Sequence, residues 1–141
     1  MPATFDLTRV LPGNGYREMG PNSVKFRQRV NFALKALTAG QTGKIGVLPA
    51  GFVLTERWAF VRTPQGAVGT FNIGTSADSD GILVGCNANL AAGSNAGGTV
   101  GAFAAGTLFT TDTELWIEFA SGALSVAAVD IALRGFMLPR A

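Results

Sequence analysis

The succession of short strand-type runs, each ended by turn residues, is the feature that most restricts what this chain can fold into. β-branched and aromatic residues fill these runs, and such residues favour strands over helices. No long stretch keeps the 3.6-residue period of an amphipathic helix, although residues 30–37 (VNFALKAL) could form two helical turns. Roughly seven or eight short strands separated by turns predict an all-β fold, which we assign to a β-sandwich of jelly-roll type. The clearest strand-type runs are residues 24–34, 52–62, 68–75, 81–86, 115–119 and 124–138.

The last of these runs changes its apolar face part of the way along. The apolar positions that begin at Leu124 keep one side of an ideal strand, whereas those that begin at Val129 keep the other. Because successive side chains point to opposite faces, this change predicts a β-bulge or bend near Ala128. Gly135 predicts a second irregularity in the same strand.

Residues 1–23 form an extended N-terminal arm in this interpretation, and residues 24–141 form the β-sandwich domain. The segment RVLPGNGYREMGPNS is too rich in Pro, Gly and Asn for a helix or a regular strand. Its apolar residues could lie on their own domain or on a neighbouring subunit, and a disordered arm is a third alternative. These apolar residues are Phe5, Leu7, Val10, Leu11 and Tyr16.

The run SVKFRQRVNF, residues 23–32, carries cations on one face of a predicted strand. Lys25, Arg27 and Arg29 alternate with residues that face the core. The row is either a solvated outer face that discourages aggregation, or a surface that docks onto an acidic protein; nucleic acid is the least favoured partner. Replacing the three cations with Ser is expected to leave folding nearly intact and to weaken docking, more so at low salt. The core-facing residues are Val24, Phe26, Val30, Phe32 and Leu34.

Charge is scarce and unevenly distributed along the chain. Charged residues make up 14% of the sequence, against about a quarter in an ordinary soluble protein, which hints at surface covered by another protein. Residues 1–62 hold nine Lys or Arg and three acids, a net charge of +6. Residues 63–133 hold six acids and no Lys or Arg, a net charge of −6. The two parts could hold like subunits together, or they could mix on one folded surface.

The residue types that most enzymes need are largely missing. The chain has no histidine, which is the commonest general base. Its single cysteine, Cys86, follows apolar residues and is expected to be a buried, inert thiol. Glu114 and Glu118 lie about 13 Å apart along a strand, too far for the carboxylate pair of a glycosidase. We therefore predict a protein that is not an enzyme and has no catalytic residues.

No cofactor or metal site is predicted either. Asp78 and Asp80 in the segment ADSDGI could begin a calcium loop, but a turn closed by Gly81 is the favoured interpretation. The glycine clusters are not followed by the Gly-Lys-Ser/Thr of a phosphate-binding loop. The uncharged stretch 81–111 has no continuous apolar run of about 20 residues, so it is not expected to span a membrane.

Two segments resemble each other within the chain. Residues 45–60 and 100–119 each contain an Ala-Gly pair that leads into a segment with Glu-x-Trp. Two such units, each a glycine turn and a Trp-containing strand, would suit the two sheets of a sandwich. Chance similarity between Gly/Ala-rich segments is the alternative.

Three segments resemble small β-sandwich virion proteins of tailed bacteriophages, namely head decoration (cement) proteins and related head-fibre or spike modules. They are KIGVLPAGFVLTERWAFV, FNIGTSADSDGILVG and AAGTLFTTDTELWIEFASG, and the resemblance spans roughly residues 44–138. It implies a structural protein that is synthesised in the host cytoplasm, binds the major capsid protein on the outer capsid surface and bridges capsomers. It also implies a homo-oligomer, most simply a trimer, at symmetry axes of the shell.

Residues 1–35 would fill the place of the attachment segment by position and charge. The main alternative function is a receptor- or glycan-binding module of a head or tail fibre, in which Trp58 or Trp116 would stack on sugars. An enzyme on a sandwich scaffold is the least favoured alternative. The candidate capsid- or subunit-contacting residues are Phe5, Leu7, Arg9, Val10, Leu11, Tyr16, Arg17, Lys25, Arg27 and Arg29.

Overall fold

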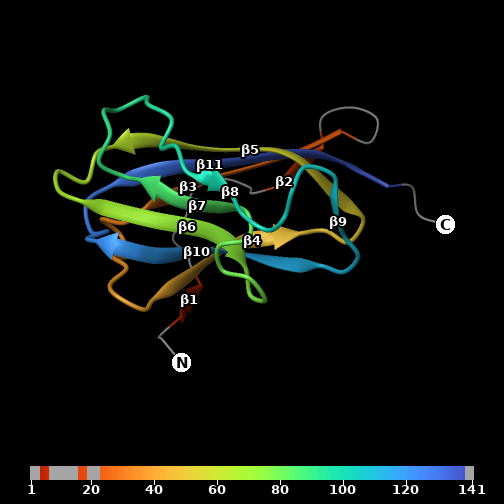
Figure 1. The fold of residues 1–141 in the computed structure, drawn as a ribbon, viewed down its shortest axis with the longest axis horizontal. Coiled ribbons are helices and arrows are strands. Elements are labelled where there is room, and N and C mark those ends of the chain that lie inside the picture. Colours follow the sequence, from red (N-terminus) through yellow and green to blue (C-terminus); the bar gives the residue numbers. More distant parts are fainter. Residues whose placement is uncertain (1–3, 7–15, 19–22, 139–141) are drawn as a thin grey trace.

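The structure, a computed structural model, describes residues 4–6, 16–18 and 23–138 as two β-sheets with no helix in these residues (Figure 1). Accordingly, nothing in the described part of the chain is a helix that could cross a membrane. The strands are β1 (Thr4–Asp6), β2 (Tyr16–Glu18), β3 (Ser23–Asn31), β4 (Thr42–Leu48), β5 (Phe52–Thr63), β6 (Gly69–Thr75), β7 (Leu83–Asn87), β8 (Thr99–Val100), β9 (Thr107–Phe109), β10 (Thr113–Gly122) and β11 (Ala128–Met137).

The strands form a β-sandwich, as predicted. Sheet A has the order β1-β4-β10-β6-β7-β8, and sheet B has the order β2-β3-β11-β5-β9. The pairs are antiparallel except for the short parallel pair of β1 with β4. Consecutive strands from β3 to β6 and from β9 to β11 alternate between the sheets. This alternation agrees with the finer assignment to a jelly roll, which stays a prediction.

The core lies between the two sheets and is built by the inward positions of each strand. Side chains alternate between the inner and outer faces along the strands, so every second residue points into the core and is removed from water. Burying each large side chain contributes about 1.5–3 kcal/mol, which makes this layer the main source of stability. The largest fully buried side chains are Phe26, Phe32, Phe52, Phe71, Leu37, Ile45, Leu48, Leu54, Ile73, Ile82 and Leu115.

The first predicted strand ends earlier than its apolar pattern indicates. β3 stops at Asn31 because a turn follows, in which the backbone N–H of Leu34 donates to the Asn31 carbonyl at 3.1 Å. The Asn31 side chain reinforces the turn by accepting from the Ala33 N–H at 3.0 Å. Phe32 is buried as predicted, but Leu34 is 62% exposed, so its placement in the core was wrong.

Sequence patterns did not reveal five of the strands. β4 has the sequence TGKIGVL, whose two glycines break the apolar alternation, although it pairs with β10 over most of its length. The strands β1, β2, β8 and β9 contain only two or three residues each. Strands this short have too few positions to show a period of two.

The irregularities predicted in the last strand are present, but the extra residues lie in its partner. The pairing of β11 with β5 shifts between Ala128 and Val129 and again between Arg134 and Gly135. In both places β5 holds the additional residue, because β11 pairs with β3 in an unbroken register. At the second bulge the Thr55 hydroxyl donates to the Arg134 carbonyl at 3.0 Å.

The chain just before β11 is a turn rather than part of the predicted strand. Gln65 is only 6% exposed, and its side-chain oxygen accepts from the backbone N–H groups of residues 125–127 at 3.0–3.1 Å. Leu124 is buried there and bridges Leu37, whereas Val126 is 50% exposed. The buried amide therefore sets the point at which β11 begins.

The glycine turns of the two similar segments lead into two neighbouring strands of sheet B. Gly51 and Gly106 both have positive φ, 91° and 94°, a conformation that L-residues with a side chain rarely adopt. Each ends a turn before a strand, β5 and β9 respectively. Trp58 then lies in β5 of sheet B, whereas Trp116 lies in β10 of sheet A. The two Trp-containing strands lie in different sheets, as predicted. The predicted unit of a glycine turn leading directly into a Trp-containing strand occurs only at Gly51, however, because β9 lies between Gly106 and β10.

Candidate binding face

The outer side of sheet B gathers charged and aromatic residues from its three longest strands, and we call this surface the basic face. It arises because the positions that alternate with the core residues of β3, β11 and β5 come into register across the sheet. Arg29 pairs with Asp130, Arg27 with Ala132, and Lys25 with Arg134 along β3 and β11. The basic face consists of Lys25, Arg27, Arg29, Glu56, Trp58, Phe60, Arg62, Asp130, Ala132 and Arg134.

Three arginines surround one buried carboxylate at one end of the basic face. Asp130 is 3% exposed, and one of its oxygens accepts from Arg29 Nε at 2.9 Å. The other oxygen lies 3.3 Å from Arg27 Nη2 and 3.6 Å from Arg62 Nε. The hydrogen bond and the charge of Asp130 together raise the pKa of Arg29. A buried carboxylate is tolerated only when it is paired in this way, so the cluster carries a net charge of about +2.

The predicted row of cations is therefore partly engaged within the protein. Lys25, Arg27 and Arg29 do lie on one outer face, as predicted, but two of the three hold Asp130. Their side chains are still 58% and 41% exposed, which leaves N–H groups available to another partner. Sequence reasoning missed Asp130 and Arg62 because only the register of β11 and β5 brings them beside β3.

An aromatic hollow occupies the middle of the basic face. A concavity of about 260 Å³ is lined by Trp58, Phe60 and Lys25 together with residues of β11. The guanidinium carbon of Arg134 lies 5.6 Å from the ring centroid of Trp58, within the range of a cation–π contact. Arg134 also pairs with Glu56 at 3.5 Å. One side of the indole is therefore occupied by a cation, which makes it a poor platform for a sugar.

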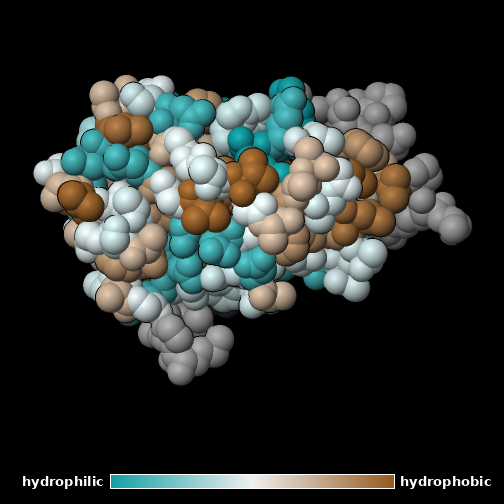
Figure 2. Space-filling view, viewed as in Figure 1, coloured by the Kyte–Doolittle hydropathy of each residue, from teal (hydrophilic) through white to brown (hydrophobic). Residues whose placement is uncertain are grey.

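An apolar row marks the other end of sheet B. Val53 lies directly opposite Phe136 on one side and Leu108 on the other. Phe136 is 40% exposed and Leu108 is 41% exposed, whereas Val53 between them is buried. Figure 2, which faces sheet A, shows further apolar residues gathered near β9. The outer side of sheet B thus combines a cationic end with an apolar one.

The candidate residues of the N-terminal arm fall partly within the described chain. Phe5 lies in β1, which pairs with β4 at the edge of sheet A. Tyr16 and Arg17 lie in β2, which pairs with β3 at the edge of sheet B, and Arg17 is in register with Lys25. The remaining candidates, Leu7, Arg9, Val10 and Leu11, lie outside the described residues.

The acidic loop of residues 75–81 forms the predicted turn. The backbone N–H groups of Thr75 and Gly81 both donate to the Asp78 carbonyl, at 2.8 and 3.1 Å. The pKa of Asp80 is raised because its protonated carboxyl group can donate a hydrogen bond to the Asp78 carboxylate. In the described part of the chain no three His, Cys, Asp or Glu side chains are grouped closely enough to hold a metal ion.

Cys86 is buried in β7, as predicted. Burial raises the pKa of its thiol to about 12, and the sulfur contacts the Gly97 carbonyl at 3.7 Å. The thiolate is the reactive form of cysteine, so a thiol with this pKa is inert near neutral pH. Trp116 is half-buried, and its indole N–H has no hydrogen-bond partner among the residues that the structure describes.

Comparisons with known proteins show where the same fold occurs. The chain matches no protein-family model and no curated protein sequence. A chain in the capsid asymmetric unit of cyanophage Pam1 has a similar structure, with a TM-score of 0.65 and 19% identity over 90% of this chain and 91% of that one. A chain in the capsid of Ralstonia phage GP4 is similar with a TM-score of 0.67 and 15% identity, over 98% and 100% of the two chains. The chain therefore shares its β-sandwich fold, over nearly its whole length, with chains of two phage capsids.

Proposed function

We propose that this protein is a non-enzymatic structural protein of a phage virion, which binds the outer capsid surface and stabilises the shell as a decoration protein. The observation that carries the proposal is the likeness to the two phage capsid chains, which extends over 91% and 100% of those chains. The likeness is thus to whole chains of similar size, and not to one domain of a much larger protein. The three segments that resemble decoration proteins support the same role.

The partner in this proposal is the major capsid protein, and the contact surface is the basic face with the N-terminal arm. The exposed arginine groups can form charge-assisted hydrogen bonds with carboxylates of the shell. The aromatic hollow beside Lys25 can accept an apolar side chain. Each contact can be weak, because a homotrimer that bridges several capsomers binds through several contacts at once, and avidity multiplies their effect.

A charge reversal on the basic face tests the proposal. Lys25→Glu places an anion beside the aromatic hollow without removing a partner of Asp130. The matched control is Lys44→Glu on sheet A, where the Lys44 ammonium is 4.0 Å from Glu114 and the pair contributes little. Binding of each variant to capsids that lack this protein is measured by co-sedimentation at about 50 and 500 mM NaCl, a range over which salt screens exposed charges.

We expect Lys25→Glu to weaken capsid binding, with the larger loss at low salt, and Lys44→Glu to bind like the parent protein. Equal losses in both variants would show that the basic face is not the contact surface. Absence of binding by the parent protein to any capsid, together with saturable binding to a glycan array, would instead support the fibre-module alternative.

A further inference from the structure

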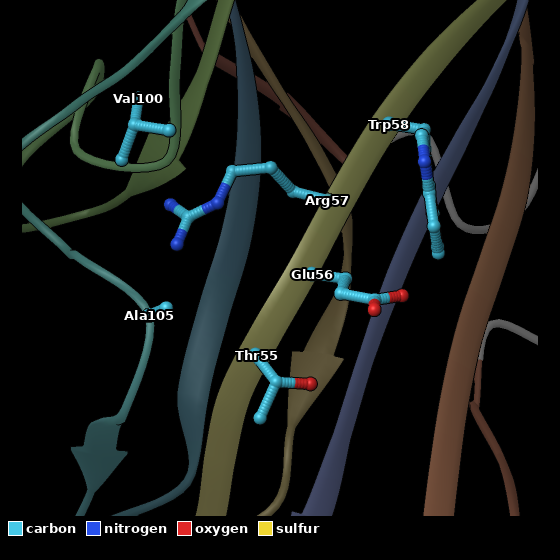
Figure 3. Close-up of a pocket in the computed structure, with 6 residues that line it drawn as sticks. All are labelled: Thr55, Glu56, Arg57, Trp58, Val100 and Ala105. Carbon is cyan, nitrogen blue, oxygen red and sulfur yellow. The ribbon is translucent and has the colours of Figure 1, made fainter.

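Arg57 is a cation that points toward the inner side of sheet B rather than toward the basic face. It lies on the same face of β5 as Ala59 and Val61, which are both 0% exposed. Figure 3 shows its guanidinium group directed toward Val100 and Ala105, whereas Glu56 and Trp58 point away on the other side of the strand. Arg57 Nη1 donates to the Ile82 carbonyl at 3.0 Å, which fixes the group beside β7.

The guanidinium charge of Arg57 has no anionic partner among the described residues. No carboxylate of these residues lies within 4.0 Å of it, and the adjacent Glu56 pairs with Arg134 instead. Partial burial lowers the pKa of Arg57, which reflects the cost of holding the charged form away from water. Charged groups that are removed from water are usually paired, so this cation differs from the arginines around Asp130.

A cavity opens at the guanidinium group. It has a volume of about 370 Å³ and is lined by residues 55–58 together with Val100 and Ala105. A guanidinium has five N–H donors, and the Ile82 carbonyl engages one nitrogen. Among the side-chain nitrogens and oxygens of the described residues, only Trp116 Nε1 is both fully buried and without a hydrogen-bond partner. The other nitrogens of Arg57 are therefore not fully buried. They remain accessible to a molecule that enters the cavity.

We propose that this cavity binds a carboxylate group, held by the guanidinium fork of Arg57. A carboxylate matches the planar geometry of guanidinium and can accept two parallel N–H groups. The single positive charge of Arg57 balances the single negative charge of a carboxylate, whereas a dianion such as phosphate would keep one charge without a partner. Val100 and Ala105 supply an apolar wall for the carbon chain that carries the carboxylate. The group can belong to a free small acid or to an Asp or Glu side chain of another protein, and the site does not depend on the capsid role.

Titration with two probes tests the site and distinguishes these sources. The first probe is sodium acetate, and the second is a blocked alanine peptide that contains one internal Glu. Backbone amide chemical shifts of Val100 and Ala105 are followed by ¹⁵N NMR, with sodium chloride added to keep the ionic strength constant. Saturation by both probes means that the cavity accepts a carboxylate on a polypeptide, whereas saturation by acetate alone restricts it to small acids.

Two variants connect the binding to Arg57. Arg57→Gln is expected to weaken acetate binding about tenfold or more, because a charge-assisted hydrogen bond contributes more than a neutral one. Lys44→Gln removes the same charge from the other sheet and is expected to bind acetate like the parent. If Arg57→Gln does not fold, Arg57→Lys keeps the charge without the fork and is expected to bind more weakly than the parent. Shifts that do not saturate with either probe, or saturation that the Arg57 variant retains unchanged, would overturn the proposal.

Discussion

Replacing Lys25, Arg27 and Arg29 with Ser together gives the sharpest test of how the basic face is built. From the sequence alone the change is expected to leave folding nearly intact. In the structure two of the three cations hold the buried carboxylate of Asp130, at 2.9 and 3.3 Å, and only Arg62 at 3.6 Å would remain. The structure therefore reverses the expectation and predicts a destabilised variant.

The size of the effect follows from the burial of Asp130. Removing one partner of a fully buried ion pair costs about 3–5 kcal/mol. Here the arginine side chains are 58% and 41% exposed, so water can reach the carboxylate once they are gone, and the cost falls to roughly 2–3 kcal/mol. With a urea dependence of about 2 kcal/mol per molar, the unfolding midpoint should fall by about 1–1.5 M.

Urea unfolding followed by tryptophan fluorescence measures this shift. A second variant adds Asp130→Asn to the triple Ser change. This removes the unpaired charge of Asp130 while keeping the shape of the side chain. This addition should restore a large part of the lost stability if the cost arises from the carboxylate. A triple Ser midpoint within about 0.2 M of the parent, on the same urea scale, would refute the reasoning, because Asp130 would then need no cationic partners.

Three further results are expected. The Cys86 thiol, whose pKa is raised to about 12, should not react with iodoacetamide at pH 8 in the folded protein and should react after denaturation. Mass spectrometry measures the labelling, and rapid labelling of the folded form would contradict the burial of the thiol. Because the pKa of Asp80 is raised in the folded protein, protonated Asp80 stabilises the fold, and this stabilisation is lost as the pH rises through that pKa. The Asp80→Asn variant should therefore have a slightly higher urea midpoint than the parent at pH 7. The difference should disappear at about pH 3, where Asp80 is protonated in both states. A Cβ at position 135 would collide with the Val53 carbonyl, so Gly135→Ala should lower the free energy of unfolding by about 2–4 kcal/mol in the same urea assay. An unchanged midpoint would mean that β5 can move away from β11.

The fold was predictable wherever a strand was long enough to show its period. β5, with twelve residues, and β10, with ten, contain the predicted runs. The phase change of the last run indicated the first irregularity in its pairing, and Gly135 indicated the second. The glycine-containing β4 and the very short strands were not predictable, because pairing with longer neighbours determines their conformation. The side-chain oxygen of Gln65 was equally invisible in the sequence, since its three backbone partners lie 60–62 residues away.

The candidate site was predictable only as a row of cations. Alternation placed Lys25, Arg27 and Arg29 on one outer face, which the structure confirms. The contacts of these cations depend on the residues of the neighbouring strands. These neighbours could not be predicted, because the order of β3, β11 and β5 in sheet B is a property of the whole fold. Arg57 was hidden for the same reason, because what distinguishes it is that no carboxylate of the described residues lies near it in three dimensions.

The basic and acidic parts of the sequence come into contact in the folded protein. Asp130, from the acidic part of the chain, is held by arginines of the basic part, and Glu114 lies 4.0 Å from Lys44. The two parts thus meet within one subunit, at the sites where they would otherwise attract a second copy. Attraction between opposite halves is therefore not needed to explain the uneven sequence, and it is a weak basis for self-assembly. A homotrimer would have to draw on other surfaces, such as the apolar row of Phe136 and Leu108, which are 40% and 41% exposed.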